Sequence, residues 1–415
     1  MNTVTCRMLR ENTAETSRIS SPLTGVTVLE VSHILSGPFC TMLLADLGAR
    51  VIKVERPTLG DEARRLGPQV SGDSAYFISV NRGKSSITVD LSRDEGRKIV
   101  RELCRRVDVF VENFVPGTMQ KLGLDYAQLS LLNPRLVYAS ISGFGQNGPY
   151  AQNPALDIIV QAMGGIMSVT GEPNGPPIRP GASLGDSIAG LYATTAILAA
   201  LLERERTGKG RYVDISMLDC QVTMMENAFA RYFATGKVPG PLGSRHPAAV
   251  PFQSFATQDG YIVVALISDR SEPWGSFCTT IGHPDLTKDS RFSDAAARVQ
   301  NYAILAPLIE AAIRKKPSRE WLDEFSRIGI PCGPVNTIEA VAKDSQVLHR
   351  GMIAEIPHKK AGKWRVANSP FKFSEFSSHP QGPSPELGEH TEEVLEEMLN
   401  YSPTEISRLR SLGLV

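Results

Sequence analysis

The sequence lacks several features that would assign it to a functional class directly. Its six cysteines are scattered, with neither a CxxC pair nor the spacing of a metal site, so we expect no disulfide framework and no bound metal. No run of 18 uninterrupted apolar residues occurs, and no transmembrane helix is predicted. Lys plus Arg and Asp plus Glu each total 44. This balance gives no reason to expect nucleic acid or an anionic membrane as a partner.

Common cofactor motifs are absent too. The dinucleotide fingerprint GxGxxG does not follow the first predicted strand, where the chain instead runs from Ser32 to Pro38. An enzyme that uses nicotinamide or flavin therefore loses most of its support. There is also no Walker A motif and no HExxH spacing. What remains is an ordinary globular composition, 42% hydrophobic and 21% charged, in a chain of 415 residues long enough for two domains.

The first half of the chain predicts strands that alternate with helices. Ser36-Gly37-Pro38 opens a helix that Gly48 closes, and Ser92 with Glu95 predicts a capping box for a helix to about residue 106. The apolar runs that predict strands are 26–31, 51–54, 87–91, 107–111 and 136–141. This alternation predicts an α/β fold with a mainly parallel sheet, whose ligands bind beyond the carboxyl ends of the strands.

The pattern of predicted strands and helices changes in the second half of the chain. Residues 252–256 and 261–265, joined by Asp259-Gly260, predict a hairpin in a smaller α+β domain over 245–340. We assign 23–225 and 345–415 to the large domain. Residues 1–22 are polar and predict a disordered N-terminal extension without the apolar core of a secretory signal. A cytoplasmic location is expected, with the mitochondrial matrix as the alternative.

One carboxylate stands where covalent chemistry is possible. Asp186 follows Gly185 and precedes the apolar stretch 188–202, which predicts a long helix. Backbone N–H groups at a helix start favour negative charge and keep such a carboxylate ionised. An ionised carboxylate can attack an activated acyl group to form a covalent intermediate. The alternative is a purely structural role, because Asp is a favoured N-cap residue.

Nine motifs occur in a fixed order: LSGPF, ADLGARVIKVERP, SVNRGKSSITVDL, DVFVENFVPG, SISGFGQNGPY, LGDSIAGLYA, ERTGKG, GIPCGPVNTI and LGEHTEEVL. In this order they resemble the class III CoA-transferase family, which includes the formyl-CoA:oxalate and carnitine CoA-transferases. The resemblance extends from Leu23 to Val415. It implies an enzyme that moves CoA between carboxylic acids without a metal or organic cofactor, so that coenzyme A is a substrate. It further implies an interlocked homodimer of ring-shaped chains, each with a Rossmann-like large domain and a smaller inserted domain.

The resemblance also assigns roles to residues. Asp186 matches the catalytic aspartate of the family, which carries first the acyl group and then the CoA thiol. Arg56, Asn113 and Lys121 match positions that contact CoA, although relatives often have Arg in place of Lys121. A longer set matches CoA-lining positions: Leu35, Ser36, Val89, Asp90, Leu91, Ser92, Phe114, Val115, Pro154, Ala155, Leu156 and Asp157.

The carboxylic acids are less well defined. Formyl-CoA:oxalate enzymes have glutamine where this chain has Leu35, which argues against formate and oxalate and favours succinyl-CoA or another dicarboxyl-CoA as donor. Arg245 and His246 are candidates for contact with a second carboxylate. For His246, a plain loop role beside Pro247 is the competing interpretation.

Two other functions fit parts of the sequence. An α-methylacyl-CoA racemase needs a histidine to move the α-proton, and similar racemases carry it in a Gly-His-Asp segment. Here Leu156 stands at that position, and no histidine occurs between His33 and His246. A CoA-binding protein without catalysis is the other alternative, but such a protein has no use for the nucleophile Asp186.

Overall fold

The computed structural model describes residues 21–267, 271–376 and 378–415. The chain divides into two compact units. Unit 1 contains residues up to Gln152, then Ala189–Ile215 and Met352–Val415, and unit 2 contains Asn153–Ile188 and Ser216–Gly351. The predicted large domain includes residues 153–188, which cluster with unit 2. Of the predicted N-terminal extension, residues 1–20 lie outside the described part of the chain.

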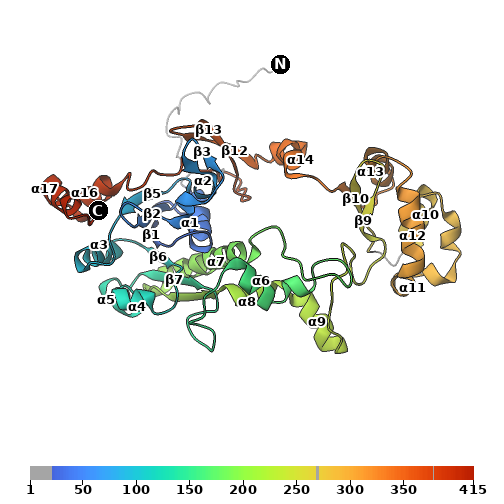
Figure 1. The fold of residues 1–415 in the computed structure, drawn as a ribbon, viewed down its shortest axis with the longest axis horizontal. Coiled ribbons are helices and arrows are strands. Elements are labelled where there is room, and N and C mark those ends of the chain that lie inside the picture. The colour runs from blue at the N-terminus through green and yellow to red at the C-terminus, as the bar shows by residue number, and fades with distance from the viewer. Residues whose placement is uncertain (1–20, 268–270, 377) are drawn as a thin grey trace, which may run out of the picture. The chain divides into compact units, whose positions relative to one another are not determined.

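Unit 1 is built on a six-stranded sheet with the order β5-β2-β1-β6-β7-β8 (Figure 1). The strands are β1 (Thr27–Val31), β2 (Arg50–Glu55), β5 (Ser85–Thr88), β6 (Val109–Glu112), β7 (Val137–Ser142) and β8 (Tyr212–Ser216). The pairs β2–β5, β1–β2, β1–β6 and β6–β7 are parallel. The mainly parallel sheet is therefore confirmed, and its order reverses between β1 and β6.

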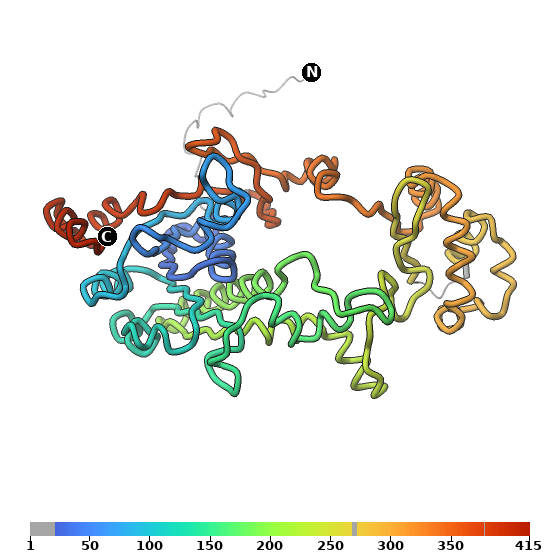
Figure 2. The backbone as a smooth tube through the Cα atoms, in the orientation of Figure 1, coloured from blue at the N-terminus to red at the C-terminus, as the bar shows by residue number. Residues whose placement is uncertain are grey.

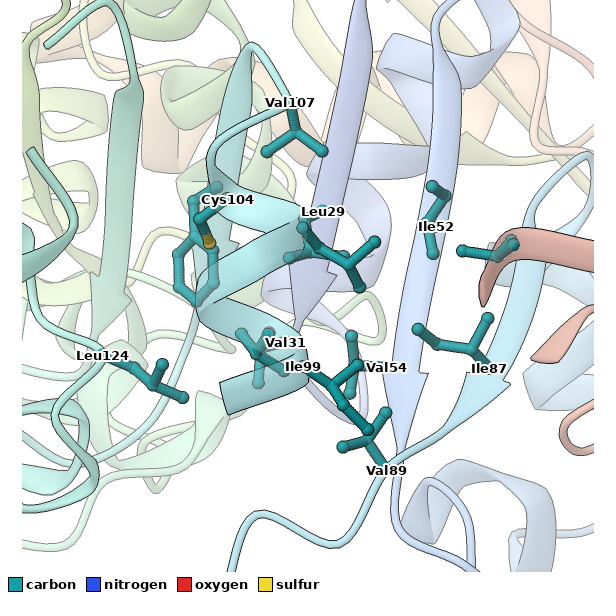
Figure 3. Packing of buried hydrophobic residues seen from close by; sticks show 14 of the residues in the cluster. Leu29, Val31, Ile52, Val54, Ile87, Val89, Ile99, Cys104, Val107 and Leu124 are labelled. Carbon is teal, nitrogen blue, oxygen red and sulfur yellow. The ribbon is translucent and has the colours of Figure 1, made fainter. Parts of the chain in front are cut away.

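One face of this sheet carries an apolar core. Leu29 and Val31 of β1 and Ile52 and Val54 of β2 point to this face because alternate strand residues share a side. They pack with α3 (Asp94–Cys104), α5 (Tyr126–Leu132), α16 (Thr391–Leu399) and α17 (Pro403–Ser411). Figure 3 shows Ile99 of α3 against these strand residues. Burial of such side chains is the dominant stabilising term of the unit.

The opposite face of the sheet is covered by α1 (Ser36–Asp46), and the part of α7 (Leu184–Thr207) that begins at Ala189 packs against α1. Gly190 permits this approach, because a Cβ there would lie 2.8 Å from the carbonyl oxygen of Ser36. By length and composition, α7 is apolar enough to cross a membrane. Ala193 and Ile197 are nevertheless fully buried within the protein, as in a core helix.

The C-terminal helix α16 packs beside β5 and adds to the apolar core, and the red end of the tube lies beside the blue segments of unit 1 (Figure 2). The backbone N–H of His390 donates to Ser86 O at 2.9 Å, and that of Asp90 donates to Leu414 O at 2.8 Å. Other elements of unit 1 are η1 (Glu62–Arg65), β3 (Gln69–Val70), β4 (Asp73–Ser74), α2 (Ala75–Asn81), α4 (Thr118–Leu122), β12 (Ile353–His358) and β13 (Gly362–Ala367).

Unit 2 has its own core around a three-stranded sheet of the order β11-β10-β9. The predicted hairpin is confirmed as β9 (Phe252–Ala256) and β10 (Tyr261–Ala265), which pair antiparallel. The Gly-Ile-Pro-Cys-Gly-Pro segment supplies β11 (Cys332–Pro334). Helices α10 (Ser271–Thr280), α12 (Tyr302–Ile313) and α13 (Ser318–Arg327) pack on it. Further elements are α6 (Asp157–Met163), η2 (Ile166–Ser168), α8 (Met217–Met224), α9 (Glu226–Thr235), η3 (Pro284–Thr287), η4 (Ser290–Phe292), α11 (Ala295–Gln300), α14 (Ile338–Lys343) and α15 (Ser345–His349).

The predicted capping box of α3 is wrong. The helix begins at Asp94 with Arg93 as the N-cap, which makes no side-chain cap hydrogen bond. Ser92 is engaged elsewhere, because its N–H and its hydroxyl donate to the Oδ1 atom of Asp90 at 2.9 and 2.6 Å. A nearer carboxylate has thus replaced the expected interaction with Glu95.

Candidate active site

The reversal of strand order between β1 and β6 creates a crevice position at the carboxyl edge of the sheet in unit 1. Asn113, just after β6, links the two strand ends. Its Oδ1 accepts the N–H of His33 at 2.9 Å, and its Nδ2 donates to His33 O at 2.8 Å and to Ser36 Oγ at 3.2 Å. The loop from Ser32 to Ser36 is therefore fixed to the end of β6.

This loop is strained as well as fixed. Ile34 has a φ of 63°, which is an unfavourable conformation for a β-branched residue. Its N–H donates to Asp61 Oδ1 at 3.0 Å, which helps to hold this conformation. Strain of this kind persists only where the surroundings enforce it, and it is concentrated at functional sites. Leu35 and Ser36 follow directly and are 8% and 4% exposed, and Leu35 packs in an apolar cluster with Met42, Leu43 and Val80.

A sealed cluster of charges lies beneath the loop. Glu30, Lys53 and Lys84 are all fully or nearly fully buried. Lys53 Nζ lies 2.8 Å from a carboxylate oxygen of Glu30 and 2.8 Å from Asp61, and Lys84 Nζ lies 2.9 Å from Glu30. Burial alone would raise the pKa of Glu30, but the two ammonium groups lower it to about 2. Lys53 also donates to Ser32 O at 2.9 Å, so the cluster fixes the loop from below.

The predicted CoA contacts of unit 1 differ in how far they are exposed to solvent. Arg56 is exposed directly after β2 and pairs with Glu62. After β5, Val89 is buried, Asp90 and Leu91 are partly exposed and Ser92 is exposed. Phe114 lies beside the loop, with its ring 4.9 Å from that of His33. Lys121 is exposed on α4.

A cavity of about 370 Å³ adjoins these residues, and its lining includes Val115, Gln120, Tyr126, Tyr212 and Glu112. Burial raises the pKa of Glu112 to about 7. The Glu112 carboxylate accepts the N–H of Phe114 at 2.8 Å. The backbone at the predicted CoA contact Phe114 is therefore tied to a carboxyl group that titrates near neutral pH.

In unit 2, Asp186 occupies the first turn of α7, as its third residue. Its side chain is partly exposed rather than sealed in the interior. The helix begins at Leu184, so Asp186 lies inside the helix and is not its N-cap. Asp186 is therefore not the N-cap residue of α7, and its negative charge still benefits from the helix start.

A different carboxylate caps this helix. Asp157, the first residue of α6, accepts the N–H of Gly185 through Oδ1 at 2.8 Å. Its other oxygen, Oδ2, accepts from Arg179 Nη2 at 2.6 Å and from Gln161 Nε2 at 2.7 Å. Arg179 also donates to Ser183 Oγ at 3.2 Å. Of the neighbouring predicted CoA contacts, Pro154 and Leu156 are exposed and Ala155 is partly exposed.

The residues before Asp186 also match a pattern known from serine hydrolases. Gly181-Ala182-Ser183-Leu184-Gly185 reads as GxSxG, which marks the nucleophile elbow of many serine hydrolases. That elbow requires a strand before the serine, and residues 176–183 form none. Ser183 instead precedes α7 and accepts a hydrogen bond from Arg179. The pattern therefore indicates no hydrolase here.

Arg245 and His246, the candidates for a second carboxylate, are engaged within unit 2. The Arg245 guanidinium lies 4.1 Å from the ring centroid of Tyr302. The His246 ring stacks on Phe252 at 4.7 Å, and its Nδ1 accepts the N–H of Ala248 at 3.1 Å. Both side chains remain partly exposed, and their substrate role stays a prediction.

Comparison with known proteins decides the family. The model of CoA-transferase family III matches residues 23–391. This chain belongs to CoA-transferase family III. As a member it is a transferase, and its substrates include CoA thioesters.

Individual relatives align with most of the chain. Succinyl-CoA:glutarate CoA-transferase of Mus musculus is 40% identical over 95% of this chain and 90% of its own length. Acetyl-CoA:oxalate CoA-transferase of Acetobacter aceti is 42% identical over 89% of this chain and 93% of its own length. A crystal structure of a CAIB/BAIF family protein from Brucella suis has a TM-score of 0.82 and 40% identity, covering 91% of this chain and all of that chain.

Proposed function

We propose that this family III CoA-transferase moves CoA from succinyl-CoA or another dicarboxyl-CoA to a carboxylic acid, with Asp186 as the covalent carrier. The observation that carries the proposal is the placement of Asp186. It is a partly exposed carboxylate in the first turn of α7, and another residue, Asp157, caps that helix. Because Asp186 is partly exposed, a substrate can reach it, and the N–H groups of the helix start favour its ionised form.

The proposed reaction has four exchanges at one carboxylate. An oxygen of Asp186 attacks the thioester carbonyl, the C–S bond breaks, and CoA thiolate leaves a mixed anhydride behind. The thiolate attacks the Asp186 carbonyl, which forms an aspartyl-CoA thioester and releases the donor acid. The acceptor carboxylate then displaces the thiolate from this thioester to form a second anhydride. The thiolate finally attacks the acceptor carbonyl, yielding the new acyl-CoA and regenerating the Asp186 carboxylate.

In this proposal the crevice residues of unit 1 bind CoA. Arg56 and Lys121 supply positive charge for its phosphates, and a lysine does so as a point charge without the two-pronged geometry of arginine. Asn113 fixes the loop that carries Leu35 and Ser36. Backbone N–H groups near Ser187 are candidates for stabilising the oxyanion of each tetrahedral intermediate.

The choice of a dicarboxyl-CoA rests on the relatives and on Leu35. The mouse relative acts on succinyl-CoA and glutarate by name, and Leu35 replaces the glutamine that formyl-CoA:oxalate enzymes use. The Acetobacter relative acts on oxalate by name, so oxalate belongs in the test. A panel of CoA thioesters against mono- and dicarboxylic acids, followed by chromatography, should include succinyl-CoA among the active donors. Activity restricted to formyl-CoA with oxalate would overturn this choice.

The covalent role has a direct test. Incubation with succinyl-CoA and then hydroxylamine should convert Asp186 into a hydroxamate, which peptide mass spectrometry locates. Asp186→Asn should bind CoA yet lose at least 10³-fold in turnover, on the scale of losing an essential nucleophile. Asp219, an exposed carboxylate in the first turn of α8, is the matched control, and Asp219→Asn should keep full activity. A fully active Asp186→Asn protein, or wash-in of solvent deuterium at the α-carbon without CoA exchange, would contradict the proposal.

We also propose the interlocked homodimer and the cytoplasmic location that the family resemblance and the sequence suggest. Light scattering of the purified protein should give twice the chain mass of 45.1 kDa. A single-chain mass at micromolar concentration would refute the dimer.

A further inference from the structure

The start of α7 is held by side chains that no catalytic step uses. Asp157 divides its two oxygens between two tasks. Oδ1 accepts the N–H of Gly185, the residue before Asp186, and Oδ2 is held by Arg179 and Gln161. A carboxylate that accepts four hydrogen bonds, two of them from one guanidinium, has little freedom to rotate.

The elements around Asp157 hold it equally firmly. Gln161 lies one turn further along α6, is fully buried, and also donates to Ala182 O at 3.3 Å. Arg179 comes from the preceding loop and reaches both Asp157 and Ser183. Asp157 itself has a side chain only 12% exposed. Three segments, α6, the loop from Arg179 to Ser183, and the first turn of α7, are thereby tied to one carboxylate.

Gly185 makes this contact close. A Cβ at Gly185 would lie 2.6 Å from Cγ2 of Val160 and 3.1 Å from Oδ1 of Asp157. A side chain there would force either Val160 or the first turn of α7 to shift. The first turn of α7 is thus seated against α6 through both a hydrogen bond and direct backbone packing.

We propose that Asp157, held by Arg179 and Gln161, is a positioning residue that fixes the first turn of α7 and so the direction of the Asp186 carboxylate. This assignment rests on the proposed function of Asp186 and is an alternative to the expectation that Asp157 contacts CoA. Displacing a reacting group by about 1 Å costs on the order of 100-fold in rate. A positioning role therefore lowers kcat and leaves the KM for acyl-CoA unchanged, whereas a CoA contact raises KM.

Three variants of the full-length enzyme test the assignment. Asp157→Asn keeps an oxygen for Gly185 but loses the charge that holds Arg179. Arg179→Gln removes the guanidinium, and Arg179→Lys restores the charge with fewer donors. We expect kcat to fall about 10- to 100-fold in the first two variants, a partial return in Arg179→Lys, and a KM for succinyl-CoA within about 2-fold of the wild type. The rate of hydroxamate formation at Asp186 should fall in parallel.

Controls separate this inference from the proposed function. Arg291 pairs with Asp289 elsewhere in unit 2 at 2.6 Å, and Arg291→Gln should leave kcat unchanged. If wild-type enzyme yields no hydroxamate, the proposed function itself fails. If it does, while Asp157→Asn and Arg179→Gln keep wild-type kcat in their folded fraction, the positioning role is refuted. A raised KM at constant kcat would instead restore Asp157 as a CoA contact.

Discussion

Under α1, Glu30 meets Lys53 and Lys84 in a setting closed to water, whereas at the start of α7 Asp157 meets Arg179 with one side of the pair open to solvent. Both clusters hold the backbone of a loop or a helix start that the proposed function uses. Their side-chain exposures differ, at 0% for Lys53 and Glu30 and 33% for Arg179. A sealed charge cannot lose its partner without a large penalty, while a partly open one can turn to water. Breaking the first should affect folding, and breaking the second should affect turnover.

The largest effect on stability is expected at the sealed cluster. Lys53→Met leaves Asp61 without its ammonium partner and should lower the free energy of unfolding by about 3 to 5 kcal/mol. Chemical denaturation of the wild type and the variant at pH 7 measures this difference. A loss below about 1 kcal/mol would show that water reaches the cluster, and the contrast with α7 would disappear.

A second buried carboxyl, that of Glu112, tests the contrast through pH. The folded-state pKa of Glu112, about 7, lies above its ordinary value of 4.5, so its stabilisation is present below 4.5 and is lost as pH rises through 7. Glu112→Gln does not titrate. The wild type should therefore lose roughly 2 to 3 kcal/mol more stability than this variant between pH 5 and pH 8. Parallel stability curves over this range, from denaturation at several pH values, would contradict a buried Glu112.

The partly open pair should matter less for folding. Arg179→Met should lower the free energy of unfolding by no more than about 1 kcal/mol, because Asp157 retains Gln161 and the N–H of Gly185. The measurement is the same denaturation experiment that is used for Lys53→Met. If Arg179→Met loses as much free energy of unfolding as Lys53→Met, the two clusters contribute equally to folding. The proposal that Arg179 acts mainly on turnover would then be weakened.

The smallest effect is expected at a pair on the surface. Arg50 and Glu397 lie 2.7 Å apart with side chains 35% and 56% exposed. Arg50→Gln should change stability by about 0.2 to 1 kcal/mol at low salt. The difference should shrink in about 1 M NaCl, where the screening length is close to 3 Å. A salt-independent loss would mean that the Arg50 side chain contributes through packing instead.

Local patterns in the sequence were sufficient to predict most of the fold. Five of the six strands in the unit 1 sheet were predicted within a few residues because parallel, doubly covered strands appear as short apolar runs, whereas β8 was not predicted. Turn residues such as Asp259-Gly260 marked the hairpin of unit 2. The capping box of Ser92 failed because Asp90, two residues earlier, competes for the same hydroxyl. Such competition depends on backbone geometry and is not visible as a spacing.

The candidate site was predicted only in part. Asp186 and the crevice residues follow strand ends or a helix start, which are positions that a pattern can mark. Arg179 gave no signal, since its partner Asp157 is 22 residues away and Arg179 itself belongs to none of the nine motifs. The sealed position of Lys53 was equally hidden, because a lysine within a strand usually points to water. Folding alone brings these partners together.

The hydrogen bonds from Asp90 to Leu414 and from His390 to Ser86 have a consequence for biosynthesis. The residues of unit 2 end at Gly351, but the apolar face of the unit 1 sheet needs helices that the ribosome makes last. During translation, all residues of unit 2 are therefore synthesised before α16 and α17. Until those two helices are made, one face of the unit 1 sheet stays uncovered. Slow or interrupted synthesis near the C-terminus should therefore expose nascent chains to aggregation through Leu29, Ile52 and their neighbours.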